Sequence, residues 1–189
     1  MKKLLITSLF STVVATQAFA VPQTYQIDPN HTFPSFSYTH LGLSTQQLRL
    51  DNTTGTVVYD KEAKTAEIDV TLDITAISTG AAAFDEHITG ANLFHTEQFP
   101  TATFKSTKVN FEGDAPKTIE GELTIKGISK PVTLEVTHFA NLAHPMLQKD
   151  AIGANATTTI LRSDFDLGLN VPAVSDEVTI TISIEAVAQ

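Results

Sequence analysis

Four stretches of the chain, 68–75, 119–126, 132–137 and 178–185, alternate apolar and polar residues almost without error. A period of two is that of a β-strand, in which successive side chains point to opposite faces of the sheet. The apolar members are Ile68, Val70, Leu72, Ile74, Ile119, Leu123, Ile125, Val132, Leu134, Val136, Val178, Ile180, Ile182 and Ile184, with Gly121 in the same register. Each strand is therefore expected to have one apolar face and one polar face.

The same reasoning extends strands over most of residues 25–187. Further strand signals cover 25–27, 32–40, 53–60, 65–77, 101–111, 118–126, 132–139, 151–162 and 174–187, with 53–60 and 65–77 forming a hairpin and a turn at 127–131. A single helix is expected over 81–94, where Phe84, Ile88 and Ala91 have helical spacing and Phe94 or His95 continues the stripe. This pattern predicts an all-β fold of about eight strands. A sheet that is apolar on one face must be covered or close on itself, and a barrel of about eight strands leaves room for one small ligand.

The first twenty residues do not fit this pattern. Lys2 and Lys3 precede an apolar run, and Ala18-Phe19-Ala20 has the form of a signal-peptidase site. The run is shorter than the roughly 20 residues that a membrane-spanning helix needs. We therefore expect a signal peptide over 1–20, cleavage after Ala20, one domain over 21–189 and a periplasmic location.

The charge and the cysteine content of the chain exclude several kinds of binding partner and of stabilising cross-link. Without residues 1–20 the chain has 10 basic and 21 acidic residues, which opposes binding to nucleic acid or to an anionic membrane. The absence of cysteine excludes disulfides and thiolate metal sites. A transmembrane barrel is the alternative all-β protein of an exported chain, but it would place the charged strand faces in its lumen.

Two strands carry the residues expected to face the interior. In 32–40 the bulkier set is Pro34, Phe36, Tyr38 and His40. In 151–162 one face carries Ile152, Ala154, Ala156, Thr158, Ile160 and Arg162. Its small residues are consistent with an unfilled tunnel with Arg162 near its mouth. The alternative is that Phe36 or Phe104 fills the space above them and that Arg162 pairs with Asp164 or Asp166.

Catalytic signals are weak. None of the six histidines has a partner at the spacing of a metal site, and no Gly-x-Ser-x-Gly motif or phosphate-binding loop is present. Asp85, Glu86 and His87 are adjacent on the expected helix and point in different directions, so helix capping and solvation explain them. We expect no catalytic residue, no metal and no cofactor. An exported enzyme acting on a lipid, with His40 or His87 as acid or base, stays as an alternative.

An ordered set of short motifs resembles the YceI-like family of lipid-binding proteins. The set consists of Ile27–Thr32, Phe36 with His40-Leu41-Gly42, Asp85–Ile88, Leu93-Phe94, Phe99–Phe104, Gly121–Gly127, Lys130–Val132 and Arg162–Phe165. The resemblance spans the chain beyond residue 20. Two positions depart from the pattern: Pro34 replaces an aliphatic strand residue, and Asp166 stands where glycine is common.

The resemblance implies an extended, eight-stranded antiparallel, lipocalin-like barrel with the helix near its mouth. It further implies a homodimer, transient membrane contact, and an isoprenoid quinone or a polyprenyl phosphate or pyrophosphate as ligand in an apolar tunnel. The expected binding residues are Phe36, Tyr38, His40, Phe84, Ile88, Phe94, Phe104, Ala154, Ala156, Ile160, Arg162 and Phe165. The acidic chain favours the neutral quinone. Some family members are linked to stress tolerance, and a stress protein without a dedicated ligand stays open.

Overall fold

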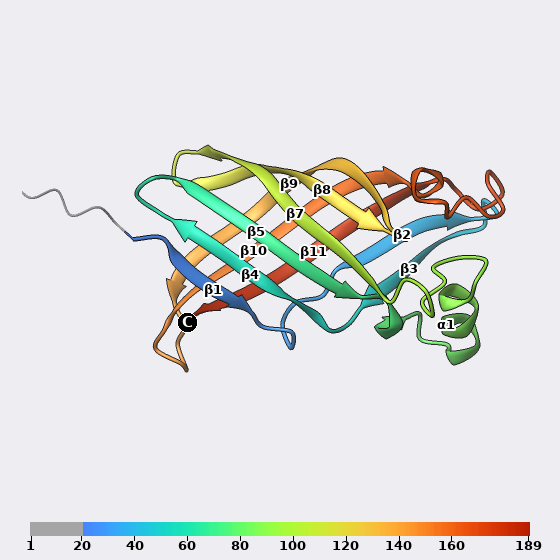
Figure 1. The fold of residues 1–189 in the computed structure, drawn as a ribbon, viewed down its shortest axis with the longest axis horizontal. Coiled ribbons are helices and arrows are strands. Elements are labelled where there is room, and N and C mark those ends of the chain that lie inside the picture. Colours follow the sequence, from blue (N-terminus) through green and yellow to red (C-terminus); the bar gives the residue numbers. More distant parts are fainter. Residues whose placement is uncertain (1–20) are drawn as a thin grey trace, which may run out of the picture.

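The computed structural model describes residues 21–189, and the expected signal peptide lies outside this range. Eleven strands make up most of the fold (Figure 1). They are β1 (Gln23–Ile27), β2 (Ser35–His40), β3 (Ser44–Leu50), β4 (Thr53–Asp60), β5 (Thr65–Asp73), β6 (Ile77–Ser78), β7 (Thr101–Glu112), β8 (Ala115–Ile125), β9 (Ile128–Ala143), β10 (Asp150–Leu161) and β11 (Glu177–Ala188). One α-helix, α1 (Ala82–Thr89), and two short 3-10 helices, η1 (Ile74–Ala76) and η2 (Arg162–Phe165), complete it.

Eight of these strands close into an antiparallel barrel. The order is β1-β4-β5-β7-β8-β9-β10-β11, and β11 pairs with β1 through Ala186 to Ala188, which closes the ring. We call these eight strands the ring. Closure removes the free edges that an open sheet would expose to other chains. The predicted all-β, eight-stranded antiparallel barrel is confirmed.

The other three strands extend the ring at one end. The first half of β11 pairs with β2, β2 pairs with β3, and β3 pairs with β6. We call β2, β3 and β6 the collar. Each collar strand is joined to a ring strand by a short connecting segment: β1 leads to β2 through 28–34, β3 leads to β4 through 51–52, and β5 leads to β6 through 74–76. In the first of these segments the amides of Asp28 and Phe33 still donate to carbonyls of β11, so the chain follows β11 through the bend.

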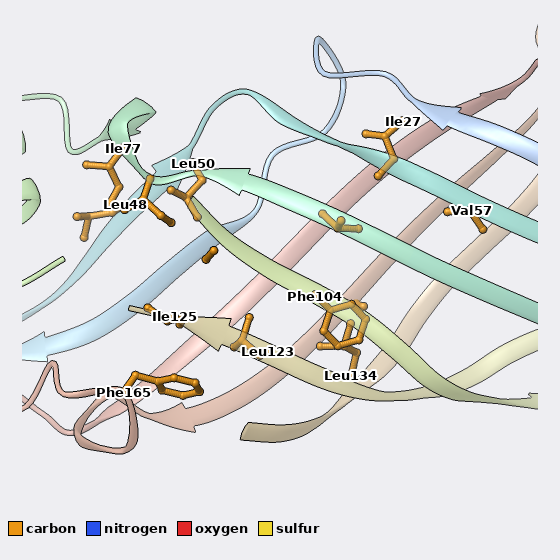
Figure 2. Packing of buried hydrophobic residues seen from close by; sticks show 14 of the residues in the cluster. Ile27, Leu48, Leu50, Val57, Ile77, Phe104, Leu123, Ile125, Leu134 and Phe165 are labelled. Atoms are coloured by element: carbon orange, nitrogen blue, oxygen red, sulfur yellow. The ribbon is translucent and has the colours of Figure 1, made fainter. Parts of the chain in front are cut away.

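The apolar faces point into the barrel. All fourteen apolar residues of the four alternating stretches line the interior cavity, whereas their polar neighbours such as Asp69, Glu122 and Glu135 are exposed. Figure 2 shows buried residues of this interior, with Leu123, Leu134 and Phe104 in the wall and Phe165, the last residue of η2, farther toward one end. Burial of the apolar face, worth about 25 cal/mol for each Å² removed from water, drives this closure.

Three local predictions are wrong. The helix ends at Thr89 instead of residue 94, because Gly90 is extended and its carbonyl accepts bonds from Leu93 and His95. The strand predicted over 65–77 breaks at η1, where the Asp73 carboxylate accepts a bond from the Thr75 amide. The predicted turn at 127–131 is a two-residue turn at 126–127 with positive φ at both positions, so Pro131 lies within β9.

Within residues 21–189 no helix combines the length and the apolar character needed to cross a bilayer.

Gly121 in β8 makes room for an aromatic side chain. A Cβ at this position would lie 2.5 Å from the Phe104 ring and 2.5 Å from the Lys105 carbonyl oxygen. Phe104 is buried and lines the cavity, so its ring can lie across the strand only because residue 121 has no side chain.

We expect Gly121→Ala to lower the free energy of unfolding by about 1–3 kcal/mol, because both the ring and the carbonyl must shift. Urea unfolding followed by circular dichroism measures this loss. Gly153→Ala in β10 is the matched control, since its Cβ would be 3.8 Å from the nearest atom, the Ile184 oxygen. Equal stability of the two variants would contradict the steric account.

Candidate ligand-binding cavity

The interior of the barrel holds one long cavity of about 340 Å³. Seven of the eight ring strands, all except β1, contribute to its wall, and the volume lies within the ~300–1,000 Å³ range of small-molecule sites. Most lining residues are Ile, Leu, Val, Phe or Ala. Among the described residues that line it, none is Asp, Glu or Lys, and Arg162 carries the one permanent charge. The wall is therefore suited to an apolar ligand.

Aromatic residues close the end of the barrel near the chain termini. Tyr59 stacks on Phe111 with ring centroids 6.1 Å apart and meets Phe139 edge-on at 5.8 Å. Behind them the Tyr25 hydroxyl donates to the Asp150 carboxylate over 2.6 Å. Burial and this bond raise the pKa of Tyr25. Burial alone would raise the pKa of Asp150, but bonds from Tyr25 and Asn141 outweigh it and lower that pKa.

The opposite end, which carries α1 and residues 162–176, is the mouth of the cavity (Figure 1). His87, Leu169 and Asn170 line the cavity and are exposed, so the cavity reaches solvent here. The polar side chains of Tyr38 and His40 line the same end from β2. A ligand with a long apolar part and a polar head would therefore place its head at the mouth.

Arg162 holds the segment that follows β10. Its Nε donates to the Ser175 carbonyl over 2.8 Å and its Nη2 to the Val174 carbonyl over 2.9 Å, and Nη1 bonds the Leu167 carbonyl. Burial lowers the pKa of the guanidinium, although Asp176 and Tyr38 oppose this. The same burial raises the pKa of Tyr38, which the Arg162 charge partly offsets.

Both interpretations of Arg162 need correction. The side chain lines the cavity near its mouth, as the tunnel hypothesis expects, but three of its five N–H groups are committed to backbone carbonyls. The predicted alternative partners are wrong: Asp166 pairs with Lys126 at 2.9 Å, and Asp164 forms no ion pair within residues 21–189. Hydrogen bonds from a side chain to backbone carbonyls of an irregular segment cannot be predicted from strand periodicity.

One polar atom in the cavity wall has no partner. The hydroxyl of Thr53, which is 1% exposed at the start of β4, makes no hydrogen bond. A buried unsatisfied hydroxyl costs about 1–3 kcal/mol. Thr32, equally buried in the same cavity wall, is satisfied, because its hydroxyl bonds the carbonyl and amide of Glu185. With less than 1 Å² of accessible surface, this Thr53 hydroxyl is also closed to a ligand atom and stays unsatisfied within the wall.

The structure brings eleven of the twelve predicted binding residues to the cavity wall. They are Phe36, Tyr38, His40, Phe84, Ile88, Phe94, Phe104, Ala154, Ala156, Ile160 and Arg162. The twelfth, Phe165, is the last residue of η2; it is 1% exposed and packs in the hydrophobic core without lining the cavity. Phe94 reaches the cavity from the turn after α1, where its ring meets Phe36 at 6.2 Å. The role of these residues in binding stays a prediction.

Sequence reasoning missed several lining residues. Tyr59 and Thr53 share the inward parity of Val57 in β4, and His87 lies three residues after Phe84 on the helix, so strand and helix periodicity could have found them. Leu169 and Asn170 lie in an irregular segment, where no periodicity is available.

The histidines show no catalytic arrangement in the described part of the chain. His40 and His87 both line the cavity, but neither forms an ion pair with a carboxylate, and His87 stacks on Phe84. His31 bonds Asp28 over 2.8 Å in the first bend. Asp85 accepts a bond from the Thr79 amide, which lies before α1, whereas the N-cap residue Ala81 has no side-chain cap bond. Between residues 21 and 189 no group of three His, Cys, Asp or Glu side chains could hold a metal.

A closed antiparallel barrel around an apolar cavity defines a protein that encloses a small apolar ligand. Within that class the chain belongs to the YceI family, since the YceI-like domain model matches residues 25–186. Protein YceI of Escherichia coli O157:H7 is 34% identical over the full length of both chains. The YceI protein of Salmonella agona is 35% identical, again over both full lengths.

Solved structures agree on the fold. A YCEI protein of Campylobacter jejuni has a TM-score of 0.68 at 25% identity, covering 80% of this chain and 90% of its own. Burkholderia cenocepacia BcnA has a TM-score of 0.71 at 21% identity, with 84% and 98% covered. A polyisoprenoid binding domain from Saccharophagus degradans has a TM-score of 0.66 at 16% identity, with 88% and 99% covered.

We expect Arg162→Lys to destabilise the fold by about 2 kcal/mol, because one ammonium cannot satisfy three separate carbonyls. The charge is kept, so the loss measures the geometry of the guanidinium. Thermal and urea unfolding check it. Lys105→Gln is the control: it removes an exposed ion pair with Asp69 and should cost less than about 1 kcal/mol. A stable Arg162→Lys variant would show that the three bonds do not hold the mouth segment.

Proposed function

We propose that this protein binds an isoprenoid lipid in its barrel cavity and carries it through the periplasm. The observation that carries the proposal is the cavity itself, which is apolar along the barrel and polar at one end. Family membership and a structural neighbour that is a polyisoprenoid binding domain support a lipid as the ligand. The signal-peptide pattern of residues 1–20 supports export.

An isoprenoid chain would gain binding free energy by burying its apolar surface against this cavity wall. Each buried CH₂ is worth about 0.8 kcal/mol, so several isoprene units offset the cost of ordering a flexible chain. Ala154 and Ala156 on β10 leave the width that Leu or Phe would fill. The proposal needs no catalytic step, and it assigns His40 and His87 to the surroundings of the head group.

A quinone is the head group that the mouth favours over a phosphate. The one permanent charge in the wall is Arg162, and three of its N–H groups already bond carbonyls. A diphosphate would need several free cationic donors to replace its hydration. A quinone is neutral and offers carbonyl acceptors to a hydroxyl donor such as that of Tyr38.

The homodimer implied by the resemblance is a separate proposal, tested by analytical ultracentrifugation.

Organic extraction of protein purified from its own bacterium is expected to release an isoprenoid quinone, identified by mass spectrometry. Ala154→Trp should lower the amount recovered several-fold, because the indole occupies the cavity. Thr159→Trp is the control, on the exposed outer face of the same strand. Recovery of no lipid from the wild-type protein would overturn the proposal, and a polyprenyl phosphate would overturn the choice of head group.

Thr53→Val tests the cost of the unsatisfied hydroxyl. Because that hydroxyl has neither a partner nor accessible surface, its loss should leave the free energy of unfolding unchanged or slightly raised, and the affinity for a short-chain quinone unchanged. Thr32→Val should lower the free energy of unfolding by about 1 kcal/mol, because that hydroxyl bonds Glu185. Urea unfolding and fluorescence titration measure the two quantities. An equal loss of stability in the two variants would contradict this account.

A further inference from the structure

Two segments that meet at the mouth contain no charged side chain. Residues 32–48 and 167–175 hold no Asp, Glu, Lys or Arg, in a chain in which 17% of residues are charged. The Leu41 amide donates to the Ala173 carbonyl over 2.8 Å, the Ser175 amide donates to the Thr39 carbonyl over 2.9 Å, and His40 bridges to Val174. These bonds join the tip of the β2–β3 turn and the segment after η2 into one edge of the mouth.

Large apolar side chains project from this edge. Leu43 is 82% exposed and Leu41 53%, and Leu169 and Val171 are also exposed. We call these four residues the rim. Leu169 also lines the cavity, as do His40, Asn170 and Val174 behind it, so the apolar surface of the rim continues into the cavity without a charged residue between them. Exposed apolar clusters of this kind mark sites of contact with a partner or a membrane.

The two charged residues that directly flank 167–175 along the chain are already engaged. Asp166 is paired with Lys126, and Asp176 accepts bonds from the amide and hydroxyl of Ser163. A charge-free apolar edge loses little hydration when it enters a neutral layer, whereas the net charge of −9 opposes an anionic one. This charge pattern fits a zwitterionic phospholipid leaflet.

We propose that the rim inserts into a zwitterionic phospholipid leaflet and joins the cavity to the membrane interior. The identity of the cargo rests on the proposed function, but the docking itself does not. An isoprenoid chain then passes from the leaflet into the barrel along an apolar surface without crossing water. A second copy of this chain is the other occupant that an apolar rim could bind, and the experiment distinguishes the two.

Flotation with vesicles of phosphatidylethanolamine and phosphatidylcholine, without quinone, tests the docking. The wild-type protein is expected to float with the vesicles at both low and high salt, because no ion pair holds it. The double variant Leu41→Ser/Leu43→Ser should lose at least about tenfold in vesicle affinity, since two exposed leucines no longer insert. Neither residue lines the cavity, so the affinity for a short-chain quinone added in solution without vesicles should be unchanged.

The matched control is Met146→Ser/Leu147→Ser at the far end of the barrel. Those side chains are 86% and 57% exposed but do not line the cavity, so this variant should bind vesicles as the wild type does. Circular dichroism checks that both variants fold.

Three results would overturn docking through the rim: no flotation of the wild type, equal loss in both double variants, or conversion of a dimer to a monomer by Leu41→Ser/Leu43→Ser without vesicle binding. A protein that floats but yields no lipid on extraction would overturn the proposed function and leave the docking intact.

Discussion

The one-sided strand is the constraint on which the rest of the structure depends. Each ring strand has an apolar face that must leave water and a polar face that must keep it, and closure satisfies both at once. Closure also fixes where an unfilled space can lie, because the small side chains of β10 face the same interior as the aromatic residues of β2 and β7. The cavity is thus a result of the same alternation that folds the chain.

The two ends of the barrel are held in different ways. The far end is packed with aromatic rings and sealed by the Tyr25–Asp150 bond, which joins β1 to β10. The mouth has an aromatic contact between Phe36 and Phe94, but its irregular segment depends on the guanidinium of Arg162 and on the Lys126–Asp166 pair. The half-buried Arg162 therefore serves mainly to hold the backbone of this segment. It leaves the mouth polar but short of the several free positive groups that a diphosphate would require.

Strand periodicity correctly predicted which side chains face the interior wherever the strands are regular. It placed Phe36, Tyr38 and His40 on the inward face of β2 and Ala154 and Ala156 on that of β10, because parity alone decides these positions. It missed β3, whose polar Ser-Thr-Gln-Gln start has no apolar face until Leu48. It also could not anticipate Phe165 or the partners of Arg162, because those contacts join an irregular segment to residues far along the chain.

The three breaks at 28–34, 51–52 and 74–76 separate the collar from the ring at one level of the wall. The ring strands are paired by backbone hydrogen bonds all the way round, with bulges between β7 and β8 and between β9 and β10, whereas the collar is tied to the ring mainly through the first half of β11 and through the connecting chain. A change in the tilt of the collar therefore leaves the ladder of the ring unbroken. Under the proposed function, ligands of different width would be accommodated by a movement of the collar. The ring, which encloses the apolar chain of the ligand, would keep its shape.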